Sequence, residues 1–201
     1  MRVMPTAIVA IAFLLGCDRK VPENGSAAVP ERPAPAKSIA PADTRRIVAI
    51  GDLHGDLDHA RRALRLAGAI DASDAWIGGK LVVVQTGDEI DRGDDDRTIL
   101  DLVDKLKIEA KTAGGELVAL LGNHEIMNAQ GDFRYVTPAG SEAFSLFGGR
   151  GAAFKPGGRY ATLLSQRPVV STVGSTIFVH GGILPKHVAY GLDKMNAEVD
   201  A

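Results

Sequence analysis

Short apolar runs alternate with longer amphipathic stretches in the first part of the chain that shows a clear periodicity. Three apolar runs are bounded by polar residues or glycine and predict strands; they are residues 46–50, 81–84 and 116–121. Two stretches between them repeat apolar residues at helical spacing and end at glycine, which predicts amphipathic helices. Their apolar faces comprise Leu57, Ala60, Leu64 and Ala67 in the first, and Ile99, Leu102, Val103, Leu106 and Ala110 in the second.

Two further runs, 169–173 and 176–179, flank Gly174-Ser175 and predict a β-hairpin. Residues between Gly131 and Gln166 are rich in glycine and only weakly periodic, so no element is assigned there. Alternating strands and helices favour an α/β sheet covered by helices. The domain is expected to begin near Thr44 and to run to the end of the chain, residues 44–201.

The first 43 residues follow a different pattern. Arg2 precedes the apolar run Ala7–Leu15, which is followed by Gly16 and Cys17, and this is the layout of a signal peptide over residues 1–17. The run is shorter than the roughly 20 apolar residues of a transmembrane helix. Residues 18–43 hold five of the ten prolines and therefore predict an extended linker.

The tetrapeptide LLGC, residues 14–17, resembles the lipobox of bacterial lipoproteins. The resemblance implies lipidation of Cys17 and an exported, membrane-anchored domain that faces the periplasm, at either the inner or the outer membrane. The alternative is an ordinary signal peptide with an incidental cysteine. Because Cys17 is the only cysteine, no intrachain disulfide can form.

Composition and charge narrow the function classes. A chain that is 45% hydrophobic and 24% charged is typical of a globular domain. A formal net charge of −2 argues against nucleic-acid binding as the main function. The sequence does not indicate an oligomeric state.

Polar motifs follow four of the predicted strands at the point where each strand ends. They are GDLHGD (51–56), GDEIDRG (87–93), GNHE (122–125) and HGG (180–182). Ligands of open α/β sheets bind at the carboxyl ends of strands, so the four motifs are expected to meet at one site. Their mixed carboxylate, amide and imidazole groups suit Mn, Fe or Zn, which predicts a centre of two divalent metal ions.

Five side chains from these motifs are candidate metal ligands. Asp52 and His54 are two residues apart on one loop and can face one ion, and Asp88 can bridge two ions with its two oxygens. Asn123 offers an amide oxygen and His180 an imidazole nitrogen. The alternative is that these residues only form turns and helix caps, which Asp and Asn favour at strand ends.

Three more residues are candidates for catalysis. His124 can protonate a leaving alcohol as a general acid, Asp91 can hold the ring of His124, and Arg92 can bind phosphate oxygens in bidentate fashion. The structural alternatives are a helix cap for Asp91 and a surface ion pair for Arg92. Glu125 is expected mainly to support its loop by hydrogen bonds.

Several charged residues outside the motifs are expected at the surface. They include His59, His187 and the run 94–96, which predicts a solvated, acidic helix start. Four basic residues either form a rim that attracts phosphate or are scattered over the surface: Arg134, Arg150, Lys155 and Arg159.

The four motifs, in this order, resemble the metallophosphoesterases of the calcineurin-like superfamily. The pattern GDxxDRG is similar to the phosphoprotein phosphatase branch, and GDLHGDL, GDFRYVTPAG and FGGR are similar to its bacterial Shewanella-like members. The resemblance covers residues 46–199. It implies an α/β fold with four αββα layers, in which a β-sandwich is flanked by helices.

The resemblance also implies how the metals are held. Asp52, His54 and Asp88 would bind the first ion, and Asp88, Asn123 and His180 would contribute to the second. A metal-bridging hydroxide would attack the phosphorus of a phosphate monoester.

Roles at the substrate follow from the same resemblance. Arg92 and Asn123 would bind the phosphate, and His124 would act as the general acid with Asp91 behind it. The implied partners are a phosphorylated protein or a small phosphoester, and the membrane through the lipid anchor.

Relatives carry one more histidine, on a Gly-His segment well downstream of HGG, together with a second phosphate-binding arginine and the last strands of the sandwich. After His180 the sequence has only His187, which has no matching context, and it ends at Ala201. The sequence is therefore expected to be a C-terminally incomplete phosphatase domain.

Three functional hypotheses remain from the sequence. The first is metal-dependent hydrolysis of phosphoproteins or small phosphate esters. The second is a catalytically inactive, metal-binding remnant, motivated by the missing histidine. The third is hydrolysis of dinucleoside polyphosphates, whose hydrolases carry similar motifs. Three results distinguish them: turnover on a phosphomonoester supports the first, metal uptake without turnover the second, and preference for a dinucleotide the third. The motifs do not choose between Ser/Thr and Tyr phosphopeptides.

Overall fold

A computed structural model of the protein describes residues 44–199. The predicted signal peptide, the lipidation of Cys17 and the linker 18–43 lie outside these residues and stay predictions. Within residues 44–199, no helix has the length and apolar character needed to cross a membrane.

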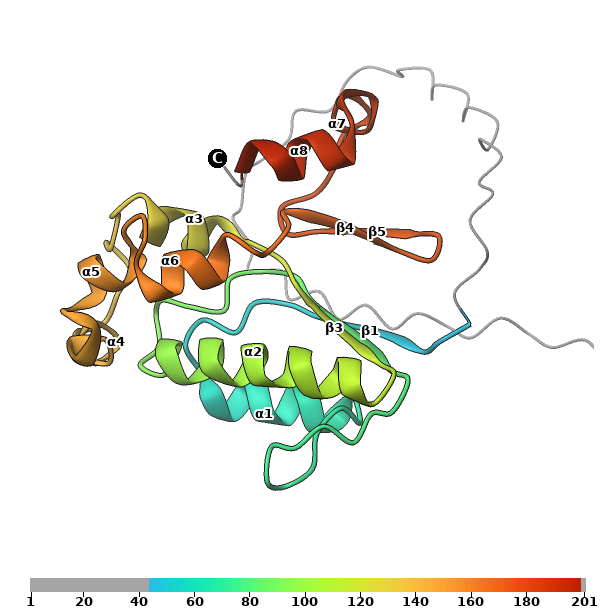
Figure 1. The fold of residues 1–201 in the computed structure, drawn as a ribbon, viewed down its shortest axis with the longest axis horizontal. Coiled ribbons are helices and arrows are strands. Elements are labelled where there is room, and N and C mark those ends of the chain that lie inside the picture. The colour runs from blue at the N-terminus through green and yellow to red at the C-terminus, as the bar shows by residue number, and fades with distance from the viewer. Residues whose placement is uncertain (1–43, 200–201) are drawn as a thin grey trace, which may run out of the picture.

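Four layers form the fold, as the family resemblance implied. Figure 1 shows helices α1 (Leu57–Leu66) and α2 (Asp96–Thr112) on one side of a sheet, the hairpin β4–β5 on the other side, and helices α7 (Pro185–Tyr190) and α8 (Leu192–Val199) beyond the hairpin. The order of layers is therefore helix, sheet, sheet, helix.

The larger sheet is parallel, with the strand order β1 (Ile47–Ile50), β2 (Val82–Gln85) and β3 (Glu116–Ala119). All four residues of β2 are buried, because this central strand is covered on both faces. The three strands begin and end within two residues of the predicted runs.

Each face of this sheet packs against a different layer. Val83 belongs to one core cluster with Leu64 of α1 and Leu106 of α2. Val84 belongs to another cluster with Val173 of the hairpin. Successive residues of a strand point to opposite faces, so a continuous apolar run in β2 supplies both cores.

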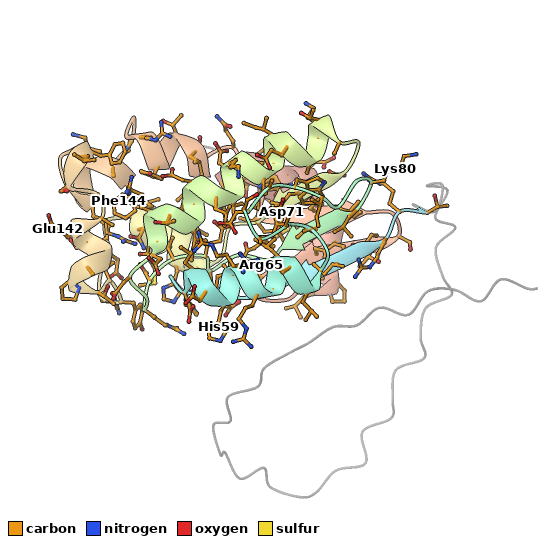
Figure 2. All side chains as sticks on the ribbon, turned by 90° about the horizontal axis from the view of Figure 1, so that it is seen from below. His59, Arg65, Asp71, Lys80, Glu142 and Phe144 are labelled. Atoms are coloured by element: carbon orange, nitrogen blue, oxygen red, sulfur yellow. The ribbon has the colours of Figure 1, made fainter. Side chains whose placement is uncertain are left out.

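The two long helices α1 and α2 form where predicted, and their apolar faces pack into the core. Asp56, from the first motif, caps α1 by accepting a hydrogen bond from the backbone N–H of His59. His59 and Arg65 are exposed on α1, which Figure 2 shows beside α2. The surface position expected for His59 is therefore confirmed.

The third motif opens the helix α3 (Asn123–Ala129), and the weakly periodic region that follows folds into α4 (Pro138–Glu142), η1 (Ser145–Phe147), α5 (Arg150–Phe154) and α6 (Arg159–Leu164). The four elements after α3 have at most six residues each, which is too short for a clear helical repeat.

Aromatic packing holds these short helices together. Phe144 meets the rings of Phe154 and Tyr160 edge to face, with centroids 5.1 and 4.9 Å apart. Figure 2 shows Phe144 at the opposite end of the molecule from Lys80, which precedes β2. The aromatic cluster therefore lies toward the carboxyl end of the parallel sheet.

The hairpin β4 (Val170–Val173) and β5 (Thr176–Val179) is antiparallel, as predicted. Its β4 edge meets α8, where Asn196 Oδ1 accepts from the backbone N–H of Val169 and Val170 at 3.0 and 3.2 Å. Asn196 Nδ2 also donates to the carbonyl of Val170 at 2.9 Å. One side-chain amide therefore takes the place of a neighbouring strand and covers an edge that would otherwise be open.

A buried ion pair joins the second motif to the segment before β4. Arg167 Nη1 lies 2.8 Å from Glu89 Oε2, and both side chains are fully buried. Burial raises the pKa of Glu89 to about 7, although the positive charge of Arg167 acts in the opposite direction. The two groups are close enough for an ion pair but are not aligned as a hydrogen bond. Their attraction joins the loop after β2 to the segment before β4.

We expect Asn196→Ala to open the edge of β4. The substitution leaves the N–H groups of Val169 and Val170 without their partner, and the free energy of unfolding falls by about 1–2 kcal/mol. Hydrogen exchange should accelerate at Val169 and Val170 and stay unchanged at Val83. Asn196→Asp keeps the acceptor oxygen and serves as the control. Equal exchange rates in all three proteins would contradict the role of Asn196.

Candidate metal centre

The four motif loops meet at the carboxyl end of the parallel sheet, as expected. Asp52 follows β1, Asp88 follows β2, Asn123 follows β3, and His180 directly follows β5. Because β1, β2 and β3 are parallel and adjacent, their exits lie at one edge. The hairpin adds His180 from the second sheet, so the site lies where both sheets end.

One buried carboxylate lies at the centre of the site. Asp88 Oδ2 is 3.9 Å from Nε2 of His54, 3.9 Å from Nε2 of His124 and 3.3 Å from Nε2 of His180. Only 3% of Asp88 is exposed, so its charge is compensated by these neighbours and not by water. Three imidazoles from three of the motifs therefore face one carboxylate.

Asp52 and Asn123 complete the cluster. Asp52 Oδ2 is 3.6 Å from His54 Nε2, and Asp52 Oδ1 is 3.8 Å from His180 Nδ1. Asn123 Oδ1 is 3.1 Å from His180 Nε2. All five candidate ligands predicted from the sequence are thus brought together.

Potential ligand atoms fall into two groups, each with spacings of at most 4.8 Å. One group is Asp52, Asp88 and His180, and the other is His54, Asp88 and His124. Asp88 belongs to both groups, as a bridging carboxylate must. The resemblance had assigned Asp52 and His54 to the same ion. Asp52 falls instead in the group with His180, although its side chain lies within 4 Å of both His54 and His180.

Two imidazoles are oriented for ligation by backbone carbonyls. Nδ1 of His54 donates to the carbonyl of Ile90 at 3.2 Å, and Nδ1 of His180 donates to the carbonyl of Thr86 at 3.0 Å. A carbonyl can only accept, so Nδ1 carries a hydrogen and Nε2, which faces Asp88, is the nitrogen that offers a lone pair when the ring is neutral. Metal-binding histidines usually carry such an outer hydrogen bond. The nitrogen and oxygen donors therefore fit divalent ions such as Mn, Fe or Zn.

Charge coupling is strongest between His180 and Asp88. The hydrogen bond to Asp88 raises the pKa of His180 to about 9, against the effect of its partial burial. Burial tends to raise the pKa of Asp88, but hydrogen bonds from His180 and from the backbone N–H of His124 outweigh it and lower the pKa. His180 must therefore release a proton before Nε2 can bind a cation.

His124 is held from behind by a buried carboxylate. Its Nδ1 donates to Asp91 Oδ2 at 2.8 Å, and both side chains are at most 1% exposed. Asn128 Nδ2 donates to both oxygens of Asp91 and to the carbonyl of His124. The helix-cap alternative for Asp91 is wrong, because the residue before α2 is Asp95.

Arg150 was a candidate for an exposed basic rim, and this prediction is wrong. Its guanidinium donates to Asp91 Oδ1 at 2.8 Å and to Asp96 Oδ2 at 2.6 Å, and it lies over the ring of Phe144 at 5.0 Å. The prediction of a solvated Asp96 is wrong for the same reason, since both carboxylates are buried and need a cation. Asp94 of the same run is exposed, as expected.

Arg92 lies at the surface beside His124. Its Nη2 donates to Nε2 of His124 at 3.2 Å, and its backbone N–H donates to the carbonyl of Tyr135 at 2.9 Å. The guanidinium is 5.7 Å from the centre of the Tyr135 ring. The expected neighbours Arg92 and His124 are therefore in contact, and Tyr135 joins them.

Backbone strain is concentrated in these loops. Four of the five described non-glycine residues with positive φ belong to the motifs, namely His54, Asp88, Asp91 and Arg92, with φ of 46°, 57°, 70° and 70°. Such conformations cost free energy and persist only where the surroundings hold them, which is common at functional sites.

Glu125 supplies part of that restraint. Its carboxylate accepts the backbone N–H groups of Asp88, Glu89 and Gly122, each at 2.8 Å. A Cβ at Gly122 would lie 2.2 Å from Asp88 Oδ1, so only glycine permits this approach. The supporting role expected for Glu125 agrees with these bonds.

Several residues at the site had been missed. Asn128 carried a usable signal, because it follows His124 by four residues and one turn of helix. Asp96 carried none. Tyr135 and Arg150 stand in the stretches GDFRYVTPAG and FGGR, but nothing in the sequence connected them with the site, since Arg150 is separated from Asp91 by 59 residues and from Asp96 by 54.

Arg150→Met should destabilise the protein strongly. The substitution keeps an apolar stem between the aromatic rings but leaves the carboxylates of Asp91 and Asp96 buried and unpaired. We expect the free energy of unfolding, measured in urea, to fall by about 3–5 kcal/mol. Arg134→Met, at an exposed arginine paired with Asp132, should change it by less than about 1 kcal/mol. Similar losses for both variants would contradict the role of Arg150.

Metal binding should release the proton of His180. Below about pH 9 this imidazole is mostly protonated, so uptake of Mn²⁺ at about pH 7.5 should release roughly one proton, and none above about pH 10. Calorimetry in two buffers with different ionisation enthalpies measures this number. His180→Asn should abolish the release, whereas His59→Asn should keep it. The same release in His180→Asn as in the unsubstituted protein would contradict the assignment.

Comparisons with known proteins agree with this geometry. The model of the calcineurin-like phosphoesterase family matches residues 45–199. Shewanella-like protein phosphatase 2 of Arabidopsis thaliana is 41% identical, over 77% of this chain and 50% of the relative. Shewanella-like protein phosphatase 1 of Plasmodium berghei is 37% identical, over 69% of this chain and 39% of the relative.

A solved structure gives the same result. The crystal structure of a cold-active protein-tyrosine phosphatase from a psychrophilic Shewanella species matches with a TM-score of 0.71 and 30% identity, over 78% of this chain and 48% of that chain. This chain spans about half, or less, of the length of these proteins. The resemblance read from the motifs is confirmed, and the chain belongs to the calcineurin-like phosphoesterase family.

Proposed function

We propose that this chain carries the metal-binding and proton-donating groups of a metal-dependent phosphomonoesterase. One observation carries the proposal: three imidazoles surround Asp88, and one of them, His124, is also oriented by Asp91 and contacts Arg92. Turns or helix caps need none of these contacts. A site that binds cations, grips an anion and donates a proton needs all of them.

Two divalent ions, held by the five candidate ligands, would supply Lewis acidity toward the phosphate and toward a nucleophilic water. Those ligands are Asp52, His54, Asp88, Asn123 and His180. Glycines in the motif loops have no Cβ, so the loops can lie close to one another and to the side chain of Asp88.

The remaining work falls to His124 and its neighbours. Arg92 turns from Nε2 of His124 toward the phosphate oxygens, which frees Nε2 to carry a proton. Asp91 keeps Nδ1 protonated, so the transferable proton is the one on Nε2, and this proton goes to the oxygen of the leaving alcohol. We expect Asn123, whose Oδ1 is 3.1 Å from His180 Nε2, to contact the phosphate as well.

The names of the relatives suggest a substrate class. Two are called protein phosphatases and one is titled a protein-tyrosine phosphatase. We therefore infer that the substrates are phosphorylated proteins or small phosphate esters.

His124→Asn should lower kcat on p-nitrophenyl phosphate by about 10²- to 10⁴-fold, because the leaving group loses its proton donor. Metal content, measured in the same preparation, should stay similar, and His59→Asn should leave kcat unchanged. Chelation of the metal should abolish turnover in all three proteins, and Mn²⁺ should restore it in the unsubstituted protein and in His59→Asn.

Two results would count against this function. Stoichiometric metal uptake without turnover in the unsubstituted protein would favour the inactive remnant. Faster turnover on a dinucleoside polyphosphate than on phosphomonoesters would favour that class of hydrolase instead.

A further inference from the structure

We propose that the amino end of the parallel sheet is a docking surface for an anionic membrane, and that a cationic cavity at this end binds the phosphate groups of the lipids. A domain docked in this way directs its metal centre away from the lipid. The inference concerns a part of the molecule that the proposed function does not use, so the two can fail separately.

The cationic cavity lies beside the residues that lead into β1 and β2. It has a volume of about 350 Å³, and three of its lining residues are basic, namely Arg45, Arg46 and Lys80. None of the described residues that line it is acidic. Guanidinium and ammonium groups bind phosphate oxygens through charge-assisted hydrogen bonds, so the lining is suited to a phosphate group.

The three basic residues differ in how far their charge is already compensated. Arg45 pairs with Glu116 at 3.1 Å. Nη1 of Arg46 donates to the carbonyl of Ala67 at 2.8 Å, and a carbonyl carries no formal charge. Lys80 is exposed, and its ammonium group has no hydrogen bond or ion pair within residues 44–199. The cavity therefore carries an excess of positive charge that an anion can balance.

Two exposed apolar side chains flank the cationic cavity. Leu66 is 80% exposed and lies two residues before the lining residue Gly68. Ile77 is 60% exposed and directly precedes the lining residue Gly78. The backbone N–H of Ile77 donates to the carbonyl of Ala69 at 2.8 Å, so the two segments lie side by side. Apolar side chains among basic ones suit a lipid interface, where the former enter the acyl region and the latter meet the phosphates.

The point at which the chain enters the domain favours a membrane as the occupant. Thr44, the first described residue, itself lines the cavity, and 43 residues precede it. The sequence predicts a lipidated Cys17 and a linker over residues 18–43 in that part of the chain. An anchor there keeps lipid close to the end of the domain where the chain enters. Contacts too weak to hold a free domain then suffice to fix the orientation of a tethered one.

Docking at this end leaves the metal centre accessible. Lys80 precedes β2 and Asp88 follows it, so the cavity and the metal centre lie at opposite ends of the parallel sheet. Figure 2 shows Lys80 at the end of the molecule opposite Phe144. Substrates therefore approach the metal centre from the side that faces the water.

Trp76 is a local probe of this surface. It is the only tryptophan of the chain, it directly precedes Ile77, and its Nε1 donates to the carbonyl of Gly79 at 3.3 Å. The full chain is mixed with vesicles of phosphatidylcholine alone or of phosphatidylcholine with phosphatidylglycerol, each prepared with and without brominated acyl chains. We expect tighter binding to the anionic vesicles, and quenching of Trp76 by the brominated lipid.

Two double variants locate the effect. Arg46→Gln with Lys80→Gln should weaken binding to the anionic vesicles by about fivefold for each charge removed and should reduce the quenching of Trp76. Lys155→Gln with Arg159→Gln removes the same charges from exposed positions outside the docking surface and should change neither. Near-ultraviolet circular dichroism checks that both variants are folded. Inorganic phosphate, compared with chloride at equal ionic strength, should not release the protein from the vesicles.

Other outcomes overturn the proposal. Bound protein with unquenched Trp76 means that another part of the chain holds the membrane. Equal binding to both kinds of vesicle, no binding to either, or equal losses in the two double variants removes the role of the cavity. Specific release by inorganic phosphate means that the cavity serves a soluble anion instead. Absent turnover on p-nitrophenyl phosphate would count against the proposed function alone, because none of these measurements depends on turnover.

Discussion

The arrangement of the site depends on one buried cation. Arg150 places its guanidinium between Asp91 and Asp96 and over the ring of Phe144, with hydrogen bonds of 2.8 and 2.6 Å to the two carboxylates. Without that charge, two buried carboxylates would lack a counter-charge in a region closed to water. Asp91 in turn fixes the ring of His124. The proton donor of the proposed reaction is thus oriented by an arginine that never reaches the substrate.

The loop around Asp88 needs support from several directions for a related reason. It contains left-handed residues that are costly for anything but glycine, and it carries the carboxylate that three imidazoles share. Glu125 holds its N–H groups, and the Glu89–Arg167 pair ties it to the segment that enters the hairpin. Because the hairpin also delivers His180, the contacts that hold the strained loop also tie it to the segment leading to that ligand.

The region between Gly131 and Gln166 supplies none of the candidate metal ligands, yet it supports the residues around them. It contributes Arg150 beneath Asp91 and the segment of Tyr135 beside Arg92. Its short helices gather round an aromatic cluster that ends the molecule beyond the strand exits.

The sequence by itself determined the strands, the two long helices, the hairpin and the convergence of the motif residues. Those features depend on the spacing of neighbours along the chain and on the rule that parallel strands end at one edge. The burial of Asp96 and Arg150, and the place of Tyr135 beside His124, were decided only by the tertiary structure. Each of these residues gains its role from partners that are distant in sequence, 59 residues in the pair Arg150–Asp91. From sequence alone, a charged residue is expected at the surface, because burying an unpaired charge costs free energy. Burial becomes possible only when folding brings a counter-charge from a distant part of the chain into the same interior.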